Sequence, residues 1–115
     1  MPTTVRQVAG VTTLCVDRWS GPESPSALEI ERKLRAEGLV PYRYSDPPGK
    51  TYAPHRHATH EVRWLLSGRM RVRVAGFAEE ILLGPGDRLD VPAGLTHAVA
   101  VEGDEPVVCV AAEAR

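Results

Sequence analysis

Three of the four histidines of this chain lie within six residues of one another, next to a carboxylate: His55, His57, His60 and Glu61. The fourth, His97, follows a Pro-Ala-Gly turn further along the chain. Imidazole and carboxylate groups are the ligands that borderline transition metals prefer. Because all the histidines fall in two short segments flanked by turn residues, we expect them to build one site.

The spacing of these residues suggests how they meet. His55 and His57 are two residues apart, so on a strand both side chains point to the same face. A turn over residues 58–60 would return Glu61 beside them from the next strand, and His97 would arrive from a further strand. Three histidines and one glutamate leave coordination positions open on a metal, and open positions are what Lewis-acid or O2 chemistry requires.

One segment of the chain has the pattern of a helix. Ser26 suits the N-cap position, and Glu29 three residues later completes a capping box. Gly38 suits the position just after the last turn. We therefore predict a single helix over residues 26–37. Its apolar stripe consists of Ala27, Ile30 and Leu34.

The remaining segments are short apolar runs separated by turn residues, and ten glycines and ten prolines mark the turns. Strands or extended segments are expected over residues 3–8, 11–16, 39–44, 51–57, 61–66, 69–75, 79–83, 88–91, 97–101 and 107–111. The first two could form a hairpin or a pair of edge strands. Many short strands with frequent turns predict an all-β jelly-roll sandwich or barrel.

The 115 residues predict one domain, with strands and the helix in residues 1–38 and the barrel core in residues 39–112. Fourteen basic and fifteen acidic residues give a net charge of −1, which argues against nucleic-acid and membrane partners. The N-terminus has no apolar signal-peptide region, and no apolar run approaches a membrane span. Cys15 and Cys109 are expected to be reduced thiols, so we predict a cytoplasmic location.

The histidine segments also carry glycine and proline at fixed spacing. The first reads Gly49-x5-His55-x-His57-x3-Glu61-x6-Gly68. The second reads Gly86-x5-Pro92-x-Gly94-x2-His97-x3-Val101. The two segments resemble the signature motifs of the cupin superfamily, over about residues 39–112. Every defining position of the first is present, and in the second only the final Asn is replaced, by Val101.

This resemblance implies a double-stranded β-helix, the cupin barrel, preceded here by the predicted helix. It also implies that four residues ligate one divalent transition metal: His55, His57, Glu61 and His97. Cupin metals include Mn, Fe, Ni, Zn and Cu, so the resemblance does not name the metal. Val101 is not at a ligand position, and its presence affects the expected local strand geometry rather than the metal.

Two further residues are candidates for catalysis. His60 could be a fifth ligand, a general base at the barrel mouth, or a solvated turn residue. Arg63 should face the same cavity as Glu61, where its guanidinium could clamp a substrate carboxylate bidentately. Alternatively, a bulge turns Arg63 outward, or it pairs with a buried acid such as Asp90. Alternation predicts three residues inside the barrel and one outside: Thr51, Ala53 and Leu65 inside, and Tyr52 outside.

The leading hypothesis is a small metal-dependent enzyme, of oxygenase or isomerase type, that acts on a small polar or carboxylate-bearing molecule. Arg63 would orient the substrate and His60 would move a proton. The alternative is a non-catalytic module that binds or senses a small molecule. A structural barrel without metal ranks last, because all four ligand positions are intact. The strands over residues 3–16 have few partners in so small a barrel, so we also predict a homodimer.

Overall fold

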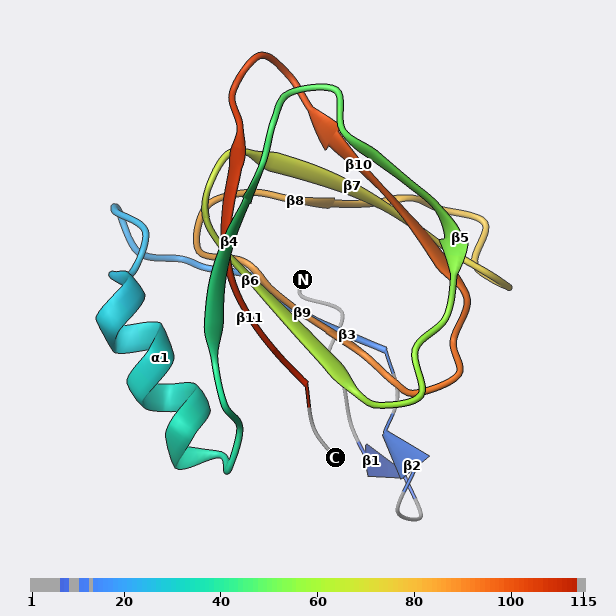
Figure 1. The fold of residues 1–115 in the computed structure, drawn as a ribbon, viewed down its shortest axis with the longest axis horizontal. Coiled ribbons are helices and arrows are strands. Elements are labelled where there is room, and N and C mark those ends of the chain that lie inside the picture. The colour runs from blue at the N-terminus through green and yellow to red at the C-terminus, as the bar shows by residue number, and fades with distance from the viewer. Residues whose placement is uncertain (1–6, 9–10, 13, 114–115) are drawn as a thin grey trace.

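The computed structural model describes residues 7–8, 11–12 and 14–113, and two antiparallel sheets facing each other form its body (Figure 1). One sheet has the strand order β5-β10-β7-β8 and the other β3-β9-β6-β11-β4, while β1 and β2 pair as a hairpin. The elements are β1 (Gln7–Val8), β2 (Val11–Thr12), β3 (Cys15–Asp17), α1 (Ala27–Ala36), β4 (Tyr42–Asp46), β5 (Thr51–His55), β6 (Glu61–Ser67), β7 (Arg69–Val74), β8 (Ile81–Leu83), β9 (Arg88–Val91), β10 (His97–Glu102) and β11 (Val107–Glu113).

This arrangement confirms the predicted all-β jelly roll with one helix. The strands from β6 to β11 lie close to their expected positions, whereas β4 begins and ends later than the predicted strand over residues 39–44. The predicted strand over residues 3–8 is described only at Gln7–Val8. No helix among the described residues is long and apolar enough to cross a membrane.

Helix α1 covers the outer face of the five-stranded sheet (Figure 1). The Ser26 hydroxyl accepts a hydrogen bond from the backbone N–H of Glu29 at 3.2 Å, which satisfies an N-terminal N–H of the helix. Ile30 and Leu34 are fully buried against the sheet. Their partners on the sheet are Val62, Trp64, Val110 and Ala112. A bidentate ion pair ties the helix to β4: Arg43 bonds to the carboxylate of Glu31 at 2.8 and 2.9 Å.

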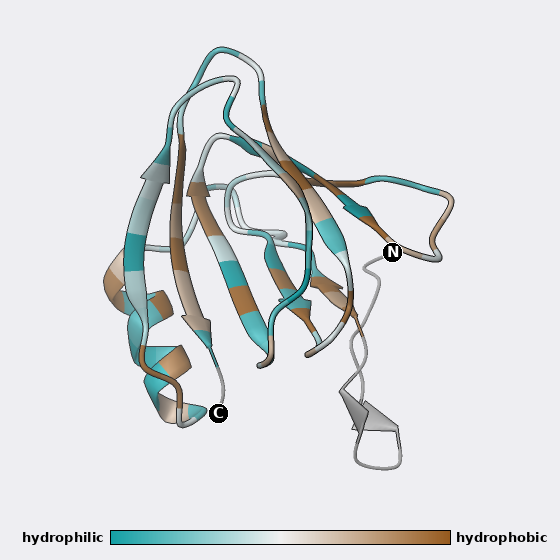
Figure 2. Ribbon diagram, turned by 45° about the vertical axis from the view of Figure 1, so that its right-hand side comes forward, coloured by the Kyte–Doolittle hydropathy of each residue, from teal (hydrophilic) through white to brown (hydrophobic). Residues whose placement is uncertain are grey.

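A second apolar core lies between the two sheets. Strand β7 shows the alternation that builds it: Met70, Val72 and Val74 are buried, and the three intervening arginines are exposed. The same alternation of hydrophobic and hydrophilic positions is visible along the strands in Figure 2. Val101 belongs to this core and pairs with Met70 within an unbroken β10. Valine at this motif position therefore fills apolar space and leaves the strand intact.

Strand β5 contains a β-bulge that changes which residues face the cavity. His55 lies opposite His97 on β10, but Tyr52 lies opposite Val99, so three residues of β5 span two of β10. The extra residue falls at Ala53-Pro54, and Pro54 has no N–H to give to a ladder. The bulge turns Tyr52 to the inner face, so the predicted outward direction of Tyr52 is wrong.

Candidate metal centre

Three histidines converge at one end of the space between the sheets. His55 ends β5 and His97 begins β10, directly opposite each other, while His57 lies in the loop after β5. Their potential ligand atoms all lie within 4.8 Å of one another. The bond from the Gly94 N–H to the His57 carbonyl, 2.8 Å long, holds the two loops together. The structure thus brings His97 next to His55 and His57, which lie in a distant segment of the sequence. Each of the two segments contributes one histidine at the end of a strand.

Backbone carbonyls orient two of the three rings. Nδ1 of His55 lies 2.7 Å from the Ala53 carbonyl, and Nδ1 of His97 lies 3.0 Å from the Leu95 carbonyl. Because a carbonyl can only accept, Nδ1 carries the proton and Nε2 keeps its lone pair for a metal. Burial lowers the pKa of His97, which favours the neutral imidazole that a metal ligand needs.

Glu61 lies behind His57. Its Oε2 atom is 3.0 Å from His57 Nδ1, and the side chain is almost completely buried. That contact lacks hydrogen-bond geometry, so Glu61 Oε2 has no hydrogen-bond partner among the described residues, and the same is true of His57 Nε2 on the other side of the ring. Buried polar groups without partners are costly and rare. A bound cation would supply the missing partner, so this donor set fits a divalent metal.

Arg63 faces the same cavity as the histidines. One of its N–H groups donates to Glu61 Oε1 at 3.1 Å, and another lies 3.4 Å from the Tyr42 hydroxyl. Burial alone would favour the neutral form, but Tyr44 and Glu61 outweigh it and raise the pKa of Arg63. Arg63 is therefore a fixed cation beside the histidines. Its partner is Glu61 rather than Asp90, the acid named in the alternative prediction.

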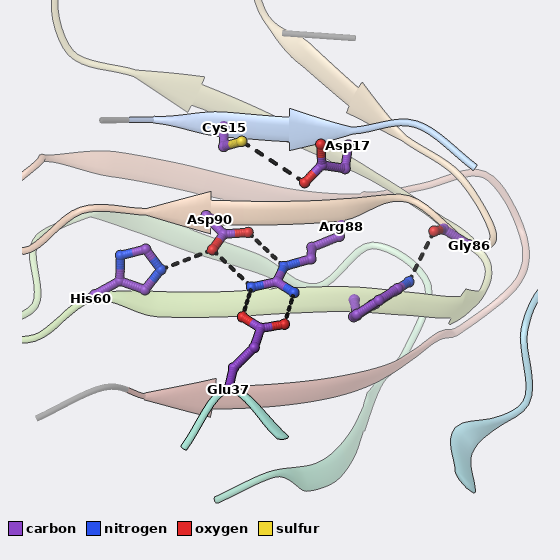
Figure 3. A network of polar contacts seen from close by, with 8 residues as sticks. Cys15, Asp17, Glu37, His60, Gly86, Arg88 and Asp90 are labelled. Atoms are coloured by element: carbon purple, nitrogen blue, oxygen red, sulfur yellow. Dashed lines mark hydrogen bonds and ion pairs between the residues drawn. The ribbon is translucent and has the colours of Figure 1, made fainter. Parts of the chain in front are cut away.

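His60 occupies a different place. Its Nε2 atom lies 2.9 Å from Asp90, which also receives two bonds from Arg88, and Arg88 is paired with Glu37 (Figure 3). Burial disfavours the charge of Asp90, but the bonds from His60 and Arg88 outweigh it and lower the pKa of Asp90. This network lies on the helix side of the five-stranded sheet, where Arg88 stacks on Trp64. His60 does not line the cavity, so the geometry gives no support to its predicted catalytic role.

The cavity itself has a volume of about 520 Å³ and lies between the sheets. Apart from the histidines and Arg63, its wall contains an apolar part and a polar part. The apolar part includes Met70, Leu89, Val91 and Val99. The polar part consists of Tyr42, Tyr44, Ser45, Asp46 and Tyr52. Sequence reasoning missed this polar wall, although the alternation of Tyr42, Tyr44 and Asp46 was the available signal.

The barrel of two facing sheets, with a histidine cluster at one end, is the arrangement expected of a cupin. The family described as "Cupin domain" matches residues 42–113, more than half of the chain. This chain therefore belongs to the cupin family.

Solved structures agree with this assignment. The DMSP lyase DddQ from Ruegeria pomeroyi DSS-3 is 28% identical with a TM-score of 0.60, over 67% of this chain and 38% of the lyase. A cupin-2 domain protein from Shewanella frigidimarina is 20% identical with a TM-score of 0.55, over 67% and 71% of the two chains. An oxalate oxidase in complex with the substrate analogue glycolate is 23% identical with a TM-score of 0.57, over 67% and 42%.

The matched region spans well under half of the lyase and of the oxidase. The likeness to the oxidase and to the Shewanella protein shows the fold alone. No curated protein matches this chain.

Proposed function

We propose that this protein is a metal-dependent enzyme, of oxygenase or isomerase type, acting on a small carboxylate-bearing molecule. His55, His57 and His97 would hold one divalent transition metal (Mn, Fe, Ni, Zn or Cu), with Glu61 as the fourth ligand. The observation that carries the proposal is a pair of buried atoms without a hydrogen-bond partner among the described residues, His57 Nε2 and Glu61 Oε2, beside a cavity large enough for a small molecule.

A bound divalent metal would supply Lewis-acid or redox chemistry at the cavity end. The residues of the chain would do the rest. Arg63 has five N–H donors, and two of them have a partner among the described residues. Its remaining donors are available to hold a substrate carboxylate and to orient the substrate toward the histidines. The apolar wall around Leu89 and Val91 would exclude water from the bound molecule.

The likeness to the DMSP lyase supports action on a small molecule in this cavity. The competing function is a module that binds a small molecule without converting it. The same cavity would serve both functions, so the experiment must measure binding and turnover separately.

The first experiment is elemental analysis of protein purified without an affinity tag, before and after addition of Mn, Fe, Ni, Zn or Cu. We expect about one metal ion per chain. A ratio near zero that none of these metals restores would overturn the proposal. The loaded protein is then assayed with a panel of enols, diketones, thiols, sugar acids, 2-hydroxy acids and DMSP. Retention of a ligand without turnover would favour the binding module.

The role of Arg63 is tested by Arg63→Lys and Arg63→Met. Lysine keeps the charge but loses the planar fork, and methionine loses both. We expect KM for a carboxylate substrate to rise in the order wild type, lysine, methionine, with a smaller change for an uncharged analogue. Equal changes for charged and uncharged substrates would show that Arg63 does not hold the carboxylate.

We also propose that the protein acts in the cytoplasm as a homodimer. Among the strands that the structure describes, β1 and β2 pair only with each other, so their outer edges would be available for pairing with a second copy. The buried thiol of Cys109 is compatible with a reducing compartment. Light scattering checks the dimer, and a monomer at micromolar concentration would contradict it.

A further inference from the structure

Asp46, the last residue of β4, is a buried carboxylate in the cavity wall with only 7% of its surface exposed. Its one hydrogen bond to a side chain within the described residues comes from the Tyr52 hydroxyl, which donates to Asp46 Oδ1 at 2.9 Å. Among the residues that the structure describes, none forms an ion pair with Asp46. Burial and the bond to Asp46 raise the pKa of Tyr52, so this phenol remains a neutral donor.

The nearby cations are engaged elsewhere. Arg63 pairs with Glu61, and the Lys50 amine lies over the ring of Tyr52, 5.1 Å from its centre. A buried carboxylate supported by one neutral donor lacks the opposite charge that normally compensates burial. Asp46 thus presents an uncompensated negative charge to the same cavity that Arg63 lines.

The sheet register places Asp46 and Arg63 at different levels of the wall. On β11, Ala111 pairs with both Tyr42 and Arg63, so these two residues lie at one level. Asp46 is four residues further along β4, a separation of about 13 Å of strand. Tyr44 lies between them, with the Arg63 guanidinium 5.2 Å from the centre of its ring. A ligand held by Arg63 at one end can therefore reach toward Asp46 at the other.

We propose that Asp46, with the rings of Tyr52 and Tyr44 beside it, is a subsite for a protonated amine. The inference rests on the proposed function and deepens it: the substrate is a zwitterion, with its carboxylate at Arg63 and its ammonium group at Asp46. An ammonium group donates charge-assisted hydrogen bonds to the Asp46 carboxylate. The two charged ends of the ligand would match the two charged ends of the cavity.

The test compares γ-aminobutyrate with butyrate, which differ by the amine, using calorimetry on metal-loaded protein. We expect wild type to bind γ-aminobutyrate at least about tenfold more tightly, since a charge-assisted hydrogen bond contributes at least that much. Asp46→Asn should abolish this preference while keeping the affinity for butyrate and the metal content. Equal affinities in wild type, or a preference that survives in Asp46→Asn, would overturn the proposal.

Two further variants separate the subsite from a structural role of Asp46. Tyr52→Phe keeps the ring but removes the hydrogen-bond donor to Asp46. In this variant the amine preference should persist. If the bond between Asp46 and Tyr52 were purely structural, Tyr52→Phe and Asp46→Asn would have equal effects. If Asp46→Asn does not fold, Asp46→Ser removes the charge in a smaller side chain and takes its place in the comparison.

Repeating the titrations on chelator-treated protein distinguishes the two proposals. An amine preference in a protein that binds no metal would sink the proposed function and leave the subsite standing. Metal binding with Arg63-dependent affinity for butyrate, but no amine preference, would sink the subsite alone.

Discussion

Oε2 of Glu61 lies 3.0 Å from Nδ1 of His57, while Oε1 of the same carboxylate accepts a hydrogen bond from Arg63. One carboxylate therefore touches both the histidine cluster and the cation that we expect to hold the substrate. A rotation of the Glu61 side chain toward a metal would change its contacts with both residues. If Glu61 is the fourth ligand, as proposed above, metal binding would be coupled to the orientation of Arg63 through Glu61.

Replacing Glu61 with glutamine removes the charge and keeps the size of the side chain. We expect metal affinity to fall by at least about 10–100-fold, the range for groups that orient or support ligands. The measurement is a competition titration with a chromophoric chelator. Glu80→Gln, at an exposed glutamate paired with Arg71, is the matched control and should bind metal like wild type. Unchanged affinity in Glu61→Gln would remove Glu61 from the metal centre.

His97 and His60 provide a second matched pair. His97→Ala removes a member of the cluster, so the metal content of the purified protein should fall close to zero. His60→Ala should retain the metal, because His60 bonds to Asp90 outside the cavity. Elemental analysis of both variants checks this, with circular dichroism to confirm folding. If His60→Ala lost the metal and His97→Ala kept it, the assignment of the two histidines would have to be reversed.

The packing of α1 predicts a large difference between two leucines of the same helix. Leu34 is fully buried against the sheet, whereas Leu28 is 66% exposed. We expect Leu34→Ala to lower the free energy of unfolding by about 2–5 kcal/mol, from lost burial and the cavity left behind. Leu28→Ala should change it by less than about 0.5 kcal/mol. Urea unfolding measures both, and similar values would mean that α1 is not docked as described.

The ion pair between Glu31 and Arg43 predicts a dependence of stability on pH. The hydrogen bonds from Arg43 lower the pKa of Glu31. Because the folded-state pKa is below the unfolded value, the pair stabilises the fold at neutral pH, and this contribution is lost as the pH falls through the folded-state pKa. Glu31→Gln should therefore be less stable than wild type at pH 7, with the two curves converging in acid.

Thermal unfolding across this pH range tests that expectation. Glu105→Gln, at an exposed position in the turn before β11, serves as the control and should follow the wild-type curve. A constant difference between Glu31→Gln and wild type down to low pH would show that the ion pair is not its cause.

Cys109 should be unreactive in the folded protein. Burial raises the pKa of its thiol to about 11, and its side chain is inaccessible in the inner core. At pH 8 roughly a thousandth of the thiol would be ionised, and the thiolate is the reactive form. In a Cys15→Ala background, we expect reaction with DTNB to be at least about 100-fold slower in native buffer than in denaturant. Comparable rates would show that β11 opens readily.

The motif residues were predictable because their spacing is tied to turns. His55 and His57 flank the end of a strand, and His97 begins another just after the turn marked by Gly94, so their meeting followed from a barrel fold. The position of His60 did not follow, because its direction depends on how a loop turns. Its partner Asp90 lies on a strand that is adjacent only in the folded sheet.

The polar wall was harder to predict for a related reason. Alternation indicates which residues of a strand share a face, but not which face is inside. Tyr42 and Tyr44 begin a strand whose start the sequence placed too early, and Tyr52 changes face at a bulge. A bulge is a one-residue difference in pairing between two strands. Pro54 is compatible with a bulge or with an edge strand, so the sequence of β5 alone does not fix which residue changes face.

The bulge at Ala53-Pro54 also divides β5 into two parts that contribute to different regions of the cavity. On its C-terminal side the strand supplies His55 in register with His97, and on its N-terminal side it supplies Tyr52 to the wall. Deleting Ala53 or Pro54 would make the strand regular and keep Tyr52 opposite Val99, whereas a substitution at Tyr52 would change the wall and leave His55 paired with His97. During evolution, a change in one codon could therefore alter which ligands the pocket accepts and leave the histidine end of the cavity unchanged.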